Sequence, residues 1–144
     1  MKGRIFAAIA VMALGLTSCE RYVYTVRDET SEEIRWYSAE FNVERWVECC
    51  DADGLNRYYV ADISIPRITS NVIRYGQVNC YLFVGAETQT PLPCVRHYEN
   101  LKAQLWTRTI DYEYYNGGLS IYVTDNDFAG DVPEPMSFRI TMAW

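Results

Sequence analysis

The stretch Met136-Ser-Phe-Arg-Ile-Thr-Met-Ala-Trp144 decides the fold class, because apolar and polar side chains alternate along it. Successive side chains of a β-strand point to opposite faces, so one face of such a strand would be apolar and the other polar. The apolar positions are Met136, Phe138, Ile140, Met142 and Trp144. This period of two predicts a half-buried β-strand.

Six earlier stretches show the same period and predict further strands. They lie at about residues 41–47, 58–65, 77–84, 101–105, 110–114 and 119–124. Turn-forming residues separate them, at 51–56, 91–93, 116–118, 125–127 and 133–135. Asn116-Gly117 in particular favours a tight hairpin.

One segment departs from this pattern. Thr69 and Ser70 offer capping hydroxyls and Gly76 offers a stop, so residues 69–75 are expected to form a short helix that carries the chain from one sheet to the other. Short strands with close turns and one small helix are typical of an all-β protein. We therefore predict an antiparallel immunoglobulin-like β-sandwich of about seven to eight strands, spanning residues 34–144.

The first 33 residues are expected to lie outside this domain. Lys2 and Arg4 precede an apolar run of residues 5–16, which is too short to cross a bilayer, since that takes roughly 20 residues. Leu16-Thr17-Ser18-Cys19 then resembles the box of bacterial lipoproteins, in which the cysteine is acylated after cleavage. This predicts a signal peptide at 1–18, lipidation of Cys19 and a tether at 19–33. A plain secretory signal and a folded N-terminal helix are the alternatives.

Charge and cysteine content restrict the partners. The predicted signal holds two of the 13 basic and none of the 19 acidic residues, so the mature chain carries a net charge of −8. This disfavours nucleic acid as a partner. An exported chain permits disulfides among Cys49, Cys50, Cys80 and Cys94, and we expect one or none rather than two. Their spacing is not that of a zinc site, and no metal or other cofactor is expected.

Several motifs together resemble small lipoproteins of Bacteroidetes that have no assigned function. They are Phe41-Asn-Val43 with Trp46, Tyr58-Tyr59 with Ile63, Ile68-Thr69 with Gly76 and Tyr81, Pro91-Leu-Pro93, and Phe138-Arg-Ile140. The resemblance covers most of the mature chain. It implies a single β-sandwich domain anchored by lipid to the outer membrane in the cell envelope, without showing which face of that membrane.

The aromatic residues are the candidate binding residues. The chain has 15% aromatic residues, including 12 tyrosines, which exceeds what a small core normally needs. Exposed rings can stack on sugars or anchor a protein, whereas the plainer alternative is core and edge packing. The candidates for binding a glycan or an envelope protein are Trp36, Trp46, Trp106, Tyr112, Tyr114 and Tyr115.

Catalytic signals are weak. Asp111 and Glu113 share one face of a strand and are the candidate pair for glycan hydrolysis, although a solvated sheet face is the preferred explanation. Asp51, Asp53 and Asn56 depart from the order of a calcium loop and are expected to form a turn, as are Asp125 and Asp127. No catalytic residues are assigned. The sequence favours a non-enzymatic binding or assembly module, with a carboxylate-dependent glycan hydrolase as the alternative.

Overall fold

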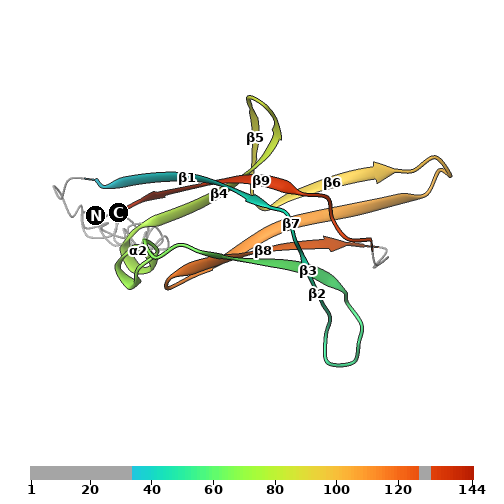
Figure 1. The fold of residues 1–144 in the computed structure, drawn as a ribbon, viewed down its shortest axis with the longest axis horizontal. Helices are drawn as coiled ribbons and strands as arrows, with labels where there is room; N and C mark the ends of the chain where they lie inside the picture. Colours follow the sequence, from blue (N-terminus) through green and yellow to red (C-terminus); the bar gives the residue numbers. More distant parts are fainter. Residues whose placement is uncertain (1–33, 127–130) are drawn as a thin grey trace, which may run out of the picture. The chain divides into compact units, whose positions relative to one another are not determined.

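The computed structural model describes residues 34–126 and 131–144, so the predicted signal peptide, Cys19, the tether and Asp127 lie outside the described residues. The described part forms two antiparallel sheets and one short helix (Figure 1). Its elements are β1 (Trp36–Val43), β2 (Val47–Cys49), β3 (Tyr58–Ser64), α2 (Ser70–Tyr75), β4 (Gln77–Gly85), β5 (Thr88–Pro91), β6 (Cys94–Glu99), β7 (Leu105–Tyr115), β8 (Gly118–Asp125) and β9 (Met136–Ala143).

The two sheets have four and five strands. The first sheet has the order β1-β9-β4-β5, and the second has the order β2-β3-β8-β7-β6. The predicted all-β sandwich with one short helix is confirmed, with nine strands in the described residues where seven to eight were expected.

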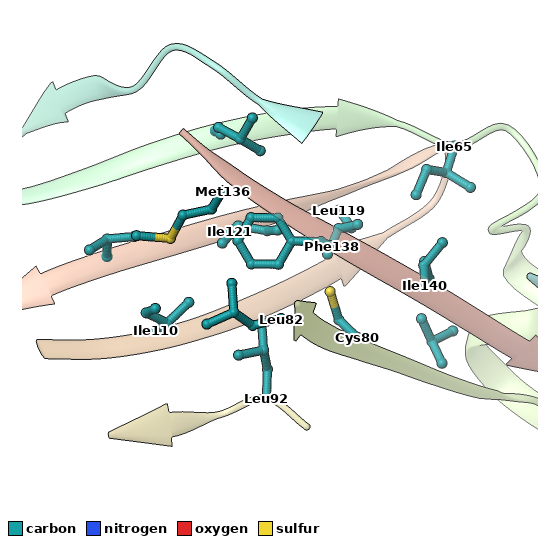
Figure 2. Packing of buried hydrophobic residues seen from close by; sticks show 14 of the residues in the cluster. Ile65, Cys80, Leu82, Leu92, Ile110, Leu119, Ile121, Met136, Phe138 and Ile140 are labelled. Atoms are coloured by element: carbon teal, nitrogen blue, oxygen red, sulfur yellow. The ribbon is translucent and has the colours of Figure 1, made fainter. Parts of the chain in front are cut away.

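The alternation in β9 is what holds the two sheets together. β9 lies between β1 and β4, and its apolar face meets the inner face of the second sheet (Figure 2). Phe138 and Ile140 are completely buried there, against a cluster that includes Leu119 and Ile121 of β8. Burial of one such side chain contributes roughly 1.5–3 kcal/mol. The terminal Trp144 is half-buried against the same core.

Helix α2 follows the predicted capping pattern. The Thr69 hydroxyl accepts a hydrogen bond from the Val72 N–H at 3.4 Å, and Val72 packs into the core. The Gly76 N–H donates to the Val72 carbonyl at 2.8 Å and ends the helix. The helix connects β3 of the second sheet to β4 of the first, which confirms its expected role.

Two strand predictions were wrong. Residues 101–104 form a turn rather than a strand, because the Asn100 carboxamide oxygen accepts from the N–H groups of Lys102 and Gln104, and Leu105 is the first residue of β7. Ala103 has a positive φ of 58° there. The stretch 41–47 is also not one strand: β1 ends at Val43 and the chain crosses to the other sheet before β2. Strands β5 and β6 were not anticipated.

The sandwich has two ends built from different segments (Figure 1). The helix end, as we call it, holds the start of β1, the end of β9, α2 and the β7–β8 turn. Backbone hydrogen bonds join these segments, from Arg35 to Trp144 in both directions and from Gly117 to Ile68. The arginine end lies opposite and holds the β6–β7 turn and the segment 131–135 that leads into β9.

Candidate functional site

The inner face of the second sheet continues past the apolar core into a polar cluster at the arginine end. On β6 and β7, Cys94 pairs with the core residue Ile110, and the next two inward-facing pairs are Arg96 with Arg108 and Tyr98 with Trp106. The rings of Tyr98 and Trp106 stack, with centroids 5.4 Å apart and planes 13° apart. We call the following six residues the arginine site: Arg96, Tyr98, Trp106, Arg108, Asp125 and Glu134.

Arg108 is the structural centre of this site. It is only 6% exposed, and its Nε and Nη2 donate to the two carboxylate oxygens of Asp125, both at 2.8 Å. Its Nη1 donates to Glu134 at 3.3 Å, and its guanidinium lies 5.5 Å from the Tyr98 ring centroid. The hydrogen bonds to Asp125 raise the pKa of Arg108 above its ordinary value. Arg108 is therefore fully engaged within the protein.

Arg96 lies directly opposite Arg108 and is bonded very differently. It is half-buried, its Nη2 donates to the Thr90 hydroxyl at 3.4 Å, and its buried Nε–H has no hydrogen-bond partner among the described residues. No carboxylate within the described ranges forms a salt bridge with Arg96. A buried donor left without an acceptor typically costs about 1–3 kcal/mol, so Arg96 is poised to accept a further partner.

Two cavities flank the Arg108 side chain. One, of about 400 Å³, is lined by Arg96, Tyr98 and Glu134 together with residues of β4 and the start of β9. The other, of about 470 Å³, is lined by Trp106, Arg108, Asp125, Asn100 and Gln104 among others. Each cavity therefore combines an aromatic side chain with groups that donate and accept hydrogen bonds, as ligand sites do.

This arrangement favours binding of an anionic group. A guanidinium presents a planar fork of N–H donors that matches a carboxylate, and it binds more strongly when water is partly excluded. Arg96 offers this fork beside the Tyr98 ring, while the charge of Arg108 is already balanced by two carboxylates. The charges of the site sum to zero, with Arg96 and Arg108 against Asp125 and Glu134, but the Arg96 guanidinium has no salt-bridge partner among the described residues and lies next to an aromatic surface.

The six aromatic candidates do not form one patch. Trp106 and Trp46 lie at the arginine end, where the Trp46 indole N–H donates to the Glu134 carbonyl at 3.2 Å. Tyr112 is half-buried between the ends and its hydroxyl donates to the Val78 carbonyl at 3.0 Å. The remaining three are exposed at the helix end, and they are Trp36, Tyr114 and Tyr115. The structure therefore divides the predicted set into two groups.

The carboxylate pair lies away from both ends, on the outer face of the second sheet. Asp111 and Glu113 line a cavity of about 530 Å³ with Tyr58 and Tyr122. Burial, followed by the charge of Glu113, raises the pKa of Asp111 above its ordinary value. The Tyr122 hydroxyl donates to Glu113 at 3.2 Å.

The four cysteines of the domain are free thiols. Cys49 on β2 and Cys94 on β6 sit on opposite edges of the five-stranded sheet, about 19 Å apart if each strand step is about 4.8 Å. A disulfide needs Cα atoms within about 7 Å, so a bond between these two is excluded. The same holds for Cys50, one residue after β2. Cys80 is buried, and its burial raises the pKa of its thiol to about 12.

The acidic turns use their side chains locally. Asp51 accepts from the Asn56 amide at 2.5 Å, and Asp53 accepts from the Leu55 N–H at 3.0 Å. Asp125, predicted to lie in a turn, is the last residue of β8 and binds Arg108. Across the described residues, no cluster of three or more histidine, cysteine or acidic side chains has a metal-binding arrangement.

Sequence reasoning missed most of the arginine site. Only Trp106 was among the candidates; Arg96, Tyr98, Arg108 and Glu134 were not. A signal for them existed, since Arg96-His-Tyr98 and Trp106-Thr-Arg108 place an arginine and an aromatic residue on one face of each of two strands. It was hidden because the strand at 94–99 was not anticipated.

Comparison with known proteins adds no relative. No protein-family model, curated protein or solved structure matches this chain. In the part of the chain that the structure covers, no helix is long and apolar enough to cross a membrane.

Proposed function

We propose that this chain is a lipid-anchored lipoprotein of the cell envelope, held in the outer membrane through Cys19, whose domain binds an acidic glycan without catalysis. The observation that carries the binding proposal is the half-buried Arg96, whose Nε–H has no hydrogen-bond partner and whose guanidinium has no ion pair within residues 34–126 and 131–144. A carboxylate of the ligand would bind the guanidinium from the cavity that Arg96 lines, and it would reach the buried Nε–H only after a shift of the Arg96 side chain.

Features around Arg96 support a glycan in preference to an acidic protein segment. Tyr98 adds aromatic surface to the cavity for contact with a sugar, although its ring already stacks on Trp106 and lies against the Arg108 guanidinium. The neighbouring cavity adds the Gln104 side chain, whose amide N–H groups can donate to hydroxyl groups, whereas the Asn100 amide is engaged with the turn and with Gln104. An acidic segment of an envelope protein is the competing ligand, and the experiment below distinguishes the two.

The test is a calorimetric titration of the full chain with oligomers of galacturonic acid, with neutral galactose oligomers and with a glutamate-rich peptide. We expect binding of the acidic sugar alone, and a loss of at least about tenfold in affinity in Arg96→Met, since a charge-assisted hydrogen bond contributes about 1.5–3 kcal/mol. Arg45→Ser is the matched control, because Arg45 is an exposed arginine outside the site. Equal binding of neutral and acidic sugars would refute the role of Arg96, and binding of the peptide alone would favour a protein ligand.

Asp111 supports a second candidate function, glycan hydrolysis. A carboxyl group whose pKa is raised can act as a general acid, and Asp111 lies with Glu113 in one cavity. This function predicts release of reducing sugar that is abolished in Asp111→Asn. Hydrolysis that survives substitution of both Asp111 and Glu113 would exclude these two residues as the catalytic pair, and absence of any hydrolysis by the wild type would exclude the function.

A further inference from the structure

The helix end has a composition unlike the rest of the domain. Its segments are 34–37, 65–77, 114–118 and 141–144, and they contain three arginines and no aspartate or glutamate, although the mature chain carries a net charge of −8. The three arginines are Arg35, Arg67 and Arg74. The helix end therefore carries positive charge, whereas the chain as a whole is acidic.

The same end exposes large apolar side chains. Ile34 is 82% exposed, Trp36 is 68% exposed and Tyr75 is 69% exposed. Ile73, Tyr114 and Tyr115 are also exposed there. Ordinary solvent-facing surface rarely gathers this many large apolar residues, and such a patch marks an interaction site.

Two of these arginines lie beside aromatic rings, and none of the three forms a salt bridge among the described residues. The Arg74 guanidinium is 5.9 Å from the Tyr75 ring centroid, and the Arg67 guanidinium is 4.9 Å from that of Tyr37. Tryptophan, tyrosine and arginine in this combination are typical of segments at the boundary between lipid and water, where rings sit among the headgroups. Arginine stems lie along apolar surface there while the charged groups reach anionic lipid.

The place where the chain enters the domain indicates that a membrane contacts the helix end. Residue 34, where the tether joins the domain, belongs to this end. The fifteen residue steps from Cys19 to Ile34 span at most about 50 Å when fully extended. A lipid at Cys19 therefore holds this end within reach of the bilayer.

We propose that the helix end rests on the membrane surface, with Trp36 and Tyr75 among the headgroups and Arg35 and Arg74 on anionic lipid, so that the arginine site faces away from the membrane. This inference rests on the membrane attachment proposed above. It adds an orientation, which presents the ligand site to the space beyond the membrane.

The test uses the full chain, produced with its own signal and reconstituted into vesicles of phosphatidylethanolamine and phosphatidylglycerol. Lipids brominated near the headgroup quench tryptophan fluorescence on contact. We expect quenching in the wild type that is largely lost in Trp36→Phe and retained in Trp106→Phe, the matched control at the other end. The double variant Arg35→Ser/Arg74→Ser should weaken the quenching, whereas Arg45→Ser should not.

Two outcomes would overturn the proposal. Equal quenching of Trp36→Phe and Trp106→Phe would show that the domain has no fixed orientation. Absence of quenching together with a dimer that Trp36→Phe dissolves would show that a second copy covers this end. The mass of the purified chain reports lipid on Cys19 separately, so a failure of attachment is distinguished from a failure of orientation.

Discussion

The two ends of the sandwich use the same residue types in opposite ways. At the arginine end, Arg108 is buried and its charge is balanced by Asp125 and Glu134. At the helix end, Arg35 and Arg74 are exposed and lie in segments without acidic residues. A buried arginine must be compensated inside the protein, whereas an exposed one leaves its charge available to something outside.

Arg96 differs from both groups, since it is half-buried but forms no salt bridge with any carboxylate in the described part of the chain. The comparison therefore separates three states of arginine in one small domain: balanced, unbalanced in a cavity, and unbalanced on a surface. Stability should depend on the first, ligand binding on the second and membrane contact on the third.

The largest effect is expected for Arg108→Ala. This change leaves the nearly buried Asp125 carboxylate without its partner, so the free energy of unfolding should fall by about 3–5 kcal/mol. Arg74→Ala at the helix end should change it by less than about 0.5 kcal/mol. Urea denaturation of both variants measures the difference. A similar small effect for both would remove the distinction between the two ends.

Cys80 lies in β4, between the two ends of the sandwich. Its ionisation should therefore lower the free energy of unfolding of the whole domain. The folded pKa is raised from 9.0 to about 12, so above pH 9 the unfolded thiol loses a proton that the folded one keeps. The free energy of unfolding should then fall as pH rises from 9 towards 12, by at most about 1.4 kcal/mol per pH unit from this group. Burial also raises the pKa of Tyr59, Tyr112 and Tyr122 above 10.0, which adds a decline in the same direction.

Cys80→Ala serves as the comparison for this pH effect. The useful interval is pH 9 to pH 10, between the ordinary pKa values of cysteine and tyrosine. Over this interval, the free energy of unfolding should fall less steeply with pH in the variant than in the wild type. Identical slopes would mean that Cys80 ionises in the folded state as it does in the unfolded one.

Gly76→Ala should disturb the helix end alone. An added Cβ would lie 2.8 Å from the carbonyl oxygens of Ala143 and Val72, so α2 or the end of β9 has to shift. We expect a loss of about 1–3 kcal/mol in stability together with weaker lipid quenching of Trp36, while affinity for galacturonate stays unchanged. Gly85→Ala is the control for stability and lipid quenching only, because its nearest neighbours are Thr88 atoms at 4.0 Å but Gly85 lines the cavity at Arg96. If Gly76→Ala weakened lipid quenching and galacturonate binding equally, the two ends would not be independent.

The smallest change in the free energy of unfolding is expected for Arg96→Met, and its sign is opposite to that of the other variants. The change removes an unpartnered buried donor and a positive charge that directly opposes Arg108. The free energy of unfolding should therefore stay the same or rise by up to about 1 kcal/mol while ligand binding is lost. Thermal unfolding followed by circular dichroism gives the sign, and marked destabilisation would show that Arg96 serves the fold.

The sequence predicted the sandwich because its strands are half-buried and alternate. Strand β9 is predictable from its strict period of two. Helix α2 is predictable from a capping hydroxyl at its start and a glycine at its end. Residues 101–105 alternate by chance, and the Asn100 side chain overrides that pattern by capping a turn. Strand β6 escaped notice because Arg96 interrupts its inward face between Cys94 and Tyr98.

The arginine site could not be predicted because it depends on register. Arg96 meets Arg108, and Tyr98 meets Trp106, only through the pairing of β6 with β7. Asp125 looked like a turn residue in sequence, although its role comes from lying opposite Arg108 on β8. The helix end was hidden for a similar reason, since its acid-free segments are scattered along the chain and become neighbours only in the folded domain.

One measurement tests the account most directly: ¹⁵N-resolved NMR spectra of the arginine Nε–H groups of the full chain during titration with galacturonate oligomers. We predict that the Arg96 signal moves with the acidic sugar, that the Arg108 signal stays in place because its donors are already engaged, and that Arg74 at the helix end does not respond. Neutral galactose oligomers should move none of them. A response at Arg74, or no response at Arg96 in a chain that binds the acidic sugar, would contradict the assignment of ligand binding to the arginine end.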